Sequence, residues 1–422
     1  MGKSVIQLRG QVRDRQIQQR NLPSVFRLEF DEWSGVLQFQ NDRNDVSPIK
    51  FLIEGSGPQR DDVHDFVLLS ADFGYLKRGD IVEFQSNFER INVHYRGPGA
   101  VNSLLLTERC DNFCIMCSQP PRDKEDSERI DVALAVLELI DDVSPAIGLT
   151  GGEPTLYGPK FLQLVENFFE IHEHGSLHIL SNGKRFADKE FAAGYSKVAT
   201  GDAMVGIPLY GPEENLHDFI VQSKGAFELT VQGIINLAAV GSAVEIRVVL
   251  QKHNVEYLDD LCRFITRNLP FVDHVALMGL EIMGLARSNL SEVWVDPLDY
   301  AQTLSRSVLH LAAHKVNVSI YNHQLCLLPR EIREFAVQSI SEWKNEFDPV
   351  CFRCDLAGSC CGFFTSARYA SSRGIRPLNL DGDFLDTDDD RLLPDARQSK
   401  VRTAWSRRSI PLGHDFGPLP DL

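Results

Sequence analysis

The stretch TERCDNFCIMCSQPP, residues 107–121, decides how this chain is interpreted, because it brings three cysteines close together. Cys110, Cys114 and Cys117 follow one another with the spacing C-x3-C-x2-C. A structural zinc ion almost always has four ligands, and a 4Fe–4S cluster is normally held by four cysteines. Three close thiolates without a fourth nearby predict a cluster with one iron left open for another molecule. A zinc site with a distant fourth ligand and three ordinary thiols are the alternatives.

A second motif follows at the end of the next predicted strand. The apolar run AIGLT, residues 146–150, ends in Gly151, Gly152, Glu153 and Pro154. Paired glycines at a strand end let a ligand approach the backbone closely, and a carboxylate there can bind a cationic amine. In isolation the four residues could be a plain turn. Downstream of the three cysteines they indicate a ligand site.

With these two motifs the chain resembles the radical S-adenosylmethionine (SAM) superfamily. The resemblance implies a 4Fe–4S cluster held by Cys110, Cys114 and Cys117, whose open iron binds the amino and carboxylate groups of SAM. In that family the reduced cluster cleaves SAM to a 5′-deoxyadenosyl radical, which abstracts hydrogen from the substrate. The cofactor supplies this chemistry, and the protein supplies orientation and shielding.

The same resemblance implies that Gly151, Gly152 and Glu153 form the edge that meets the methionyl amine of SAM. The residue before the third cysteine is often aromatic in the family, whereas this chain has Met116 there. Its thioether and backbone could still line an adenine pocket.

From Asn102 onward, strands alternate with helices. The alternation predicts a parallel sheet with helices outside it, and six units predict an α/β fold built on a partial (β/α)6 barrel. The expected strands are residues 103–106, 146–150, 177–180, 204–209, 244–250 and 274–278. Chemistry in such folds takes place at the C-terminal strand ends, where the cysteines and GGEP fall.

The same strand-end argument predicts further residues of the site. Ser181 and Asn182 could hydrogen-bond the ribose or carboxylate of SAM, or could simply form an Asn-Gly turn that needs a positive φ. Tyr210 and Arg247 are expected to face the cleft. A charge inside a strand is rarely buried unless it is paired, so Arg247 needs a carboxylate partner such as that of SAM. No catalytic residue can be assigned.

The chain divides into four expected regions. Residues 1–98 show short alternating strands and predict an N-terminal β-rich domain. Residues 99–295 carry the barrel, and residues 296–376 form a cysteine-rich extension with helices expected at 297–314 and 328–347 and a strand at 317–321. Residues 377–422 form an acidic tail whose composition predicts partial disorder.

The extension holds a second set of cysteines. Cys351 and Cys354 have C-x2-C spacing, Cys360 follows after five residues, and Cys326 supplies a distant fourth thiol. Four thiolates fit a 4Fe–4S cluster or a zinc ion, and an auxiliary cluster is favoured beside a radical SAM core. Cys360 is preferred to Cys361, which adjoins an apolar Gly-Phe-Phe run. Cys262, within a predicted helix, is expected to be a core residue.

Composition narrows the class of protein. The chain has 422 residues, 43% of them hydrophobic, nine cysteines and a net charge of −16. No apolar run approaches the roughly 18 residues that a membrane span needs, and a cytoplasmic protein is expected. Cysteines of cytoplasmic proteins bind metals more often than they form disulfides. Nucleic-acid binding relies on Lys and Arg, so an acidic chain is poorly suited to it. A basic or histidine-rich peptide matches the charge better.

A finer resemblance extends from about Asn102 to Pro377. The runs NSLLLTERCDNFCIMCSQPP, VGIPLYG, HVALMGLEIMGLA and YNHQLCLLP, with CFRC and CGFF beyond them, are similar to the His-Xaa-Ser system radical SAM maturase, C type. The resemblance implies post-translational maturation of a peptide with His-Xaa-Ser repeats. It also implies a second radical SAM maturase as partner and a reductant such as flavodoxin or ferredoxin.

Two other functions stay open. One is a radical SAM enzyme that acts on a small molecule or nucleotide. The other is a non-catalytic iron–sulfur protein that scaffolds a partner or transfers electrons, against which GGEP argues because electron transfer needs no SAM site.

Overall fold

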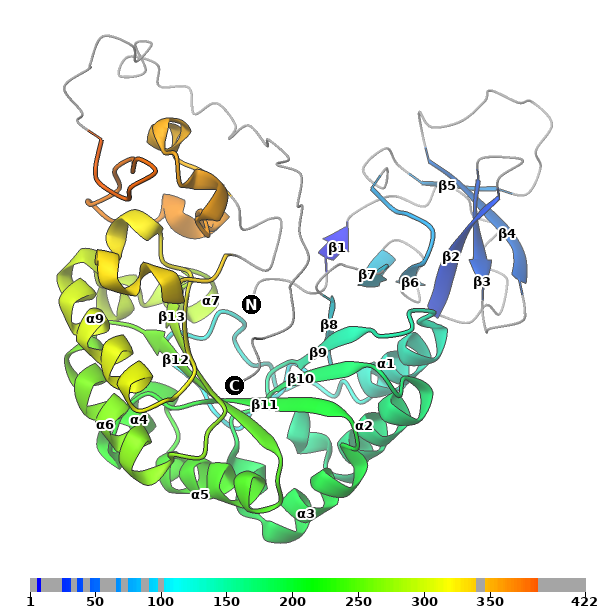
Figure 1. The fold of residues 1–422 in the computed structure, drawn as a ribbon. Helices are drawn as coiled ribbons and strands as arrows, with labels where there is room; N and C mark the ends of the chain where they lie inside the picture. Colours follow the sequence, from blue (N-terminus) through cyan, green and yellow to red (C-terminus); the bar gives the residue numbers. More distant parts are fainter. Residues whose placement is uncertain are drawn as a thin grey trace.

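The computed structural model describes residues 102–338 and 346–385 and shorter segments before them. These segments are 75–84 and 91–97, with the strands 6–8, 25–31, 36–40, 46–53 and 66–69. They form two seven-stranded sheets. Figure 1 shows the sheet that carries the motifs as a curved wall with helices along its outer side.

This motif-bearing sheet is parallel, and its strands lie in chain order from β8 at one edge to β14 at the other. Parallel neighbours require crossover connections, which here are mostly helices. The strands are β8 (Asn102–Leu105), β9 (Ala146–Thr150), β10 (Ser176–Leu180), β11 (Asp202–Pro208), β12 (Ala243–Leu250), β13 (His274–Gly279) and β14 (Val318–Tyr321).

Seven helices of eight residues or more accompany this sheet in the described part of the chain. They are α1 (Glu128–Leu139), α2 (Pro159–Ile171), α3 (Lys189–Val198), α4 (Glu214–Val221), α5 (Ala226–Ala239), α6 (Leu258–Asn268) and α9 (Pro297–Ala313). The short helices α7 (Gly284–Ser288) and α8 (Leu290–Val293) follow β13. The expected α/β class with a partial barrel is confirmed, and β14 adds a seventh strand from the region assigned to the extension.

The core lies between the sheet and its helices. Along β12 the alternate residues Val244, Ile246 and Val248 are almost fully buried in it, together with Phe161 and Phe168 of α2. Because side chains alternate across a strand, the intervening residues of each strand point to the inner side of the barrel. Those positions are therefore where a site can form.

One predicted helix is wrong. Residues 328–347 were expected to be helical, but among residues 328–338 and 346–347, which the structure describes, the one helical element is the 3-10 helix η7 (Arg330–Phe335). Ala336 then forms a parallel bridge with Ile320, and Val337 N donates to Ile320 O at 2.9 Å. Backbone pairing with the outer edge of β14 thus replaces the helix that the periodicity of the sequence predicts. Residues 339–345 lie outside the described part of the chain.

The expected β-rich N-terminal domain is confirmed in its described strands, which run in the order β1-β7-β6-β2-β3-β4-β5. All their pairings are antiparallel except that of β4 with β5. Arg27 forms an ion pair at 2.8 Å with Asp141 after α1. The strands are β1 (Ile6–Leu8), β2 (Val25–Asp31), β3 (Val36–Gln40), β4 (Val46–Ile53), β5 (Phe66–Leu69), β6 (Asp80–Phe84) and β7 (Ile91–Arg96).

The cysteine-rich extension continues past its expected end. Leu378 is fully buried and forms an antiparallel bridge with Phe384, so residues 377–385 pack as part of the extension. The remaining residues of the expected acidic tail, 386–422, lie outside the described part of the chain. The 3-10 helices of this region are η6 (Leu325–Leu327), η9 (Pro349–Arg353), η10 (Ala357–Ser359) and η11 (Thr365–Arg368). Among all described helices, none has the length and apolarity to cross a membrane.

Candidate cluster and cofactor site

The loop that carries Cys110, Cys114 and Cys117 joins β8 to α1 and is bonded directly to GGEP. Gly152 N donates to Thr107 O, and Glu153 N donates to Arg109 O, both at 2.8 Å. A Cβ on residue 152 would lie 2.1 Å from Arg109 O, a distance that no side chain tolerates. Gly152 therefore permits a close backbone approach, as the motif predicts, and the group that approaches is the cysteine loop.

The far side of the same loop is held by two other elements. Phe113 N and Ile115 N donate to the last carbonyls of α4 at 2.9 and 3.0 Å. Leu285 N, in α7, donates to Cys117 O at 2.8 Å, and Asn289 Nδ2 donates to Ile115 O at 2.8 Å. The C-terminal end of α4 and the segment of α7 with Asn289 thus fix the backbone that presents the cysteines.

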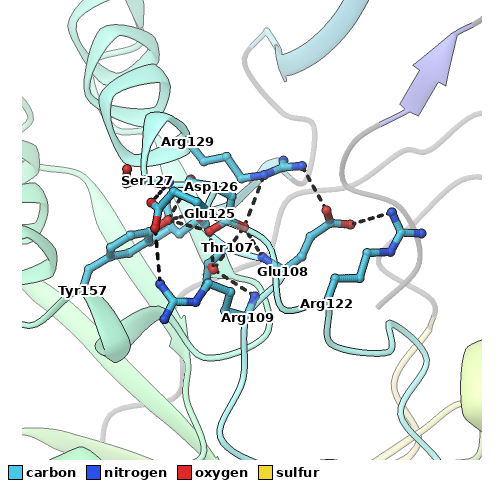
Figure 2. Close-up of polar contacts among 10 residues, drawn as sticks. Thr107, Glu108, Arg109, Arg122, Glu125, Asp126, Ser127, Arg129 and Tyr157 are labelled. Carbon is cyan, nitrogen blue, oxygen red and sulfur yellow. Dashed lines mark hydrogen bonds and ion pairs between the residues drawn. The ribbon is translucent and has the colours of Figure 1, made fainter.

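The start of the loop is anchored by a buried carboxylate, Asp126, which the sequence analysis did not identify. Asp126 is 2% exposed, and Figure 2 shows it at the centre of a polar network. It accepts hydrogen bonds from Thr107 Oγ1 at 2.9 Å and from Glu108 N at 2.6 Å. The hydroxyl of Tyr157, just after GGEP, lies 3.1 Å from the Asp126 carboxylate and 2.8 Å from its carbonyl oxygen.

Replacing Asp126 by alanine is expected to lower the free energy of unfolding by about 2–3 kcal/mol, because Glu108 N and the Thr107 hydroxyl lose their buried acceptor. The Arg122→Ala variant is the matched control. Its guanidinium is exposed and lies 3.7 Å from Glu108, so about 0.5 kcal/mol or less is expected. Urea denaturation of both variants measures the difference. Equal effects would contradict an anchoring role for Asp126.

The three thiols lie close enough to influence one another's ionisation. Burial, with smaller contributions from nearby negative charges, raises the pKa of Cys110 to about 12. Burial and then the charges of Cys117 and Cys110 raise the pKa of Cys114. Thiols of this kind stay protonated until a cation takes the place of the protons. Three buried thiols on one loop that is fixed by its backbone hydrogen bonds fit the donor set of a cluster.

Glu153 is 1% exposed and already holds several donors of the chain. Its Oε1 accepts from Thr155 N, Thr155 Oγ1 and Ser181 Oγ at 3.0, 2.6 and 2.8 Å, and its Oε2 accepts from Asn182 N at 2.5 Å. Burial raises the pKa of Glu153, and these hydrogen bonds only partly offset it. A carboxylate offers about four acceptor positions, so Oε2 retains capacity for a further donor.

Ser181 and Asn182 are placed as supports for this arrangement. Ser181 Oγ donates to Glu153, while Asn182 Nδ2 donates to Asp111 in the cysteine loop at 2.6 Å. Gly183 follows in the left-handed region at φ 82°, as an Asn-Gly turn requires. The hydrogen-bonding groups of both side chains thus contact the chain itself, and a role toward SAM stays a prediction.

Met116 and Tyr210 lie beside the loop in a small apolar cluster. Met116 is 5% exposed and packs with Tyr210, Ile220 and Val221. Burial and then the charges of Cys114 and Cys117 raise the pKa of Tyr210 well above its ordinary value. Met116 therefore forms part of the wall behind the cysteines, and its contact with adenine stays a prediction.

Arg247 has a protein partner that the sequence analysis did not identify. Its guanidinium pairs with Glu245, two residues earlier on the same inner face of β12, and lies 3.2 Å from Met278 Sδ. Glu245 is 3% exposed and also contacts His274 at 2.7 Å and His178 at 3.3 Å. A SAM carboxylate is not needed to account for this buried charge.

The ionisation of Glu245 reflects these contacts. Burial acts to raise its pKa, but the close contacts with His178 and His274 and the charge of Arg247 outweigh burial and hold the pKa well below its ordinary value. The histidines come from β10 and β13, and His274 Nε2 also lies 2.9 Å from Ser319 Oγ of β14. Four strands thus contribute to one polar network inside the barrel.

The second cysteine set lines one small, partly open cavity in the extension. Cys326, Cys351, Cys354 and Cys360 line it together with Arg376, whereas Cys361 does not. Burial and then the charges of Cys360 and Cys354 raise the pKa of Cys326 to about 11. A hydrogen bond from Cys361 lowers the pKa of Cys360 to about 6. Cys262 is fully buried in α6.

Within the described residues, no group of three Cys, His, Asp or Glu side chains could hold a single metal ion. A mononuclear zinc site draws four sulfur atoms to within about 2.3 Å of one centre. A cubane carries its iron atoms at separate corners, so its thiolates need not converge on one point. Three thiols on one loop and four around one cavity are donor types that both iron–sulfur clusters and zinc use.

Comparison with known proteins gives a family match. Residues 104–265 match the family model described as the radical SAM superfamily. The chain is 30% identical over 168 residues to the mycofactocin maturase MftC of Mycobacterium ulcerans, which covers 38% of this chain and 43% of that protein. It is also 30% identical over 154 residues to Fe-coproporphyrin III synthase of Methanosarcina barkeri, covering 36% and 37%.

The chain spans less than half the length of these curated relatives. Among solved structures, it is similar to Streptococcus suis SuiB bound to S-adenosylmethionine, with 16% sequence identity and a TM-score of 0.41. That alignment covers 54% of this chain and 51% of SuiB.

Proposed function

We propose that this chain, whose residues 104–265 match the radical SAM superfamily model, is a radical SAM enzyme that modifies a peptide. The observation that carries the proposal is the loop with three cysteines, bonded through its backbone to GGEP at the C-terminal edge of a parallel sheet. Cys110, Cys114 and Cys117 would hold the 4Fe–4S cluster. When bound, the cluster supplies the electron that cleaves SAM to a 5′-deoxyadenosyl radical.

The residues around the thiols would position SAM. The backbone of Gly151 and Gly152 and the remaining acceptor capacity of Glu153 would meet the methionyl amine. Ser181 and Asn182 would act through Glu153 and the cysteine loop, since their side chains contact those groups. Met116 and Arg247 would form the wall and the floor of the site. Glu245 would fix the position of the Arg247 guanidinium.

A second 4Fe–4S cluster is proposed for the extension. Cys326, Cys351, Cys354 and Cys360 are its ligands in this proposal, which is supported by the cavity that these four residues share. Arg376 lines the same cavity and would offset part of the negative charge of four thiolates. Zinc remains the alternative occupant, and metal analysis separates the two.

The peptide substrate rests on sequence similarity. MftC is named as a maturase, and the sequence resembles the His-Xaa-Ser maturases from about Asn102 to Pro377. The proposed substrate is a peptide with His-Xaa-Ser repeats, with a second radical SAM maturase and a flavodoxin or ferredoxin as partners. A small-molecule substrate is the second candidate, favoured by equal identity to a coproporphyrin-processing enzyme.

The test is 5′-deoxyadenosine formation by the full chain, reconstituted anaerobically with iron and sulfide and supplied with SAM and dithionite. Product detected by mass spectrometry would support the proposal. Turnover should rise when a synthetic His-Xaa-Ser repeat peptide is added, with a mass change on the peptide. Failure of SAM to bind to protein with a full cluster would overturn the proposal in favour of an iron–sulfur scaffold.

A further inference from the structure

A small, partly open pocket lies where three neighbouring strands of the barrel end. Leu250 ends β12, Gly279 ends β13 and Asn322 follows β14, and all three residues line it. Phe363 and Ala370 of the extension line it as well. Ligands of parallel α/β folds bind outside the carboxyl ends of the strands, so this strand-end pocket lies where such a fold places a ligand.

The side-chain amide of Asn322 is fixed by the turn that ends β14. Asn322 has a φ of 62°, in the left-handed region that asparagine tolerates better than most residues. Gly279 lets this turn come close, since a Cβ on residue 279 would lie 2.5 Å from Asn322 O. Asn322 Nδ2 donates to Gly279 O at 3.3 Å, so the chain uses the amide nitrogen and leaves the amide oxygen.

Gln324 is held in the same way by the extension. Its Nε2 donates to Gly362 O at 2.8 Å, and only the nitrogen of an amide can donate to a carbonyl oxygen. Neither Asn322 Oδ1 nor Gln324 Oε1 accepts a hydrogen bond from a described residue, and neither belongs to the buried atoms that lack a partner. Both oxygens are therefore accessible to a bound molecule as acceptors.

A donor accompanies these two acceptors. Trp294 also lines the pocket, and its indole Nε1–H donates to no described residue. This nitrogen is not among the buried atoms that lack a partner either, and an indole nitrogen can only donate. The hydroxyl of Tyr300, by contrast, already lies 2.8 Å from His323 Nε2. Trp294 thus offers its N–H to a ligand, whereas Tyr300 offers mainly its ring.

The lining of the strand-end pocket disfavours a charged ligand. Within the described part of the chain it includes the aromatic residues Trp294, Tyr300 and Phe363 and no charged side chain. Burying an unpaired charge is costly. A matching ligand is uncharged, supplies two N–H donors and accepts one hydrogen bond. A primary carboxamide carries this set of groups on one planar unit, whereas a carboxylate lacks donors and an ammonium group lacks an acceptor.

We propose that the strand-end pocket binds a primary carboxamide of the substrate, namely the side chain of an asparagine or glutamine of the peptide. The inference rests on the proposed peptide substrate. Leu280 lines the pocket and also packs against the apolar cluster of Met116 and Tyr210 beside the first cysteine set. Gln324 lines both the pocket and the cavity of the second set. A carboxamide bound there would hold the peptide close to both cysteine sets.

The test measures binding, independently of turnover. Three probes share one backbone: N-acetylglutamine methylamide and its glutamate and norleucine counterparts. Each is titrated by calorimetry at neutral pH into the reconstituted full chain with saturating SAM. The glutamine probe is expected to bind at least about tenfold more tightly than the norleucine probe, because its carboxamide gains hydrogen bonds. The glutamate probe should bind no better than the norleucine probe, because it brings a charge without donors.

Three variants test the location. Trp294→Phe removes the free N–H but keeps a ring, and is expected to lower the preference for the glutamine probe over the norleucine probe by about fivefold. Tyr300→Phe is the matched control, because its hydroxyl already lies against His323, and the wild-type preference should remain. Ala370→Trp fills the pocket and should weaken binding of the glutamine probe more than about tenfold. All three are first checked for wild-type iron content and circular dichroism.

Equal affinity of wild type for the glutamine and norleucine probes would overturn the inference. Wild-type preference in Trp294→Phe, an equal loss in Tyr300→Phe, or wild-type affinity in Ala370→Trp would overturn it as well. The wild-type titration is repeated without SAM. A glutamine probe that binds only in the absence of SAM would assign the pocket to the adenine of SAM, whose planar ring and amino group can use the same partners, and the carboxamide assignment would fail.

SAM cleavage without probe is measured on the same wild-type preparation. If cleavage proceeds while the preference for the glutamine probe is absent, the pocket assignment fails and the SAM chemistry stands. If cleavage is absent, the proposed function fails in its own right.

Discussion

The Cys114→Ala variant is expected to form no 5′-deoxyadenosine above the protein-free background. Cys114 is the middle cysteine of the loop. Burial is the largest cause of its raised pKa, and the charges of Cys117 and Cys110 raise the pKa further. Removing it leaves two thiolates, which cannot fix a cubane with one open iron. Product is measured by mass spectrometry after anaerobic reconstitution, and iron is measured in the same sample.

The matched control is Cys262→Ala. Cys262 is also a buried cysteine of the barrel, but it lies in the core of α6. Its loss is expected to cost about 1 kcal/mol of stability through packing and to leave iron content and product unchanged. Wild-type product from Cys114→Ala would remove this residue from the proposed ligand set. Loss of product in both variants would point to a general effect on folding.

The Cys354→Ala variant is expected to lower iron content by one cluster's worth while the iron of the first site remains. Cys354 lines the cavity of the second set, and Leu378 N donates to its sulfur at 3.3 Å. Three remaining thiolates would hold an auxiliary cluster poorly. Iron, sulfide and zinc are quantified together in wild type and variant.

The Cys361→Ala variant serves as the control for this experiment. Cys361 is buried beside Cys360 but does not line the cavity, so its replacement should leave the metal content unchanged. Loss of iron from Cys361→Ala, with iron retained in Cys360→Ala, would exchange the two residues in the ligand set. Full iron in Cys354→Ala would eliminate the auxiliary cluster, and loss of zinc in its place would establish the alternative occupant.

The features that could be predicted from the sequence are those encoded within a few residues. The spacing of Cys110, Cys114 and Cys117 is local, and so is the period-2 burial of Val244, Ile246 and Val248 that marks β12. Because each strand and helix of the barrel follows the previous one in the chain, local periodicity also predicts the order of the sheet. The paired glycines predict a close approach, as Gly152 shows.

The features that could not be predicted depend on register or on distant segments. The partner of Arg247 could have been suspected, because residues two apart share a face of a strand, but the roles of His178 and His274 depend on alignment across four strands. Asp126 lies among several acidic residues, and only its burial distinguishes it. The prediction of a helix at 328–347 was wrong because the backbone at Ala336 and Val337 pairs with Ile320 of β14.

The bridge between Ile320 and Ala336 also concerns the exposed edge of the barrel sheet. An outermost strand presents unpaired N–H and C=O groups, which invite a strand from another molecule and lead to aggregation. Ala336 and Val337 pair with the outer edge of β14 and so shield part of it from such recruitment. A chain truncated at Pro329 would retain all seven strands of the barrel sheet yet lose this shield. The extension thus covers part of an otherwise open sheet edge as well as carrying the second set of cysteines.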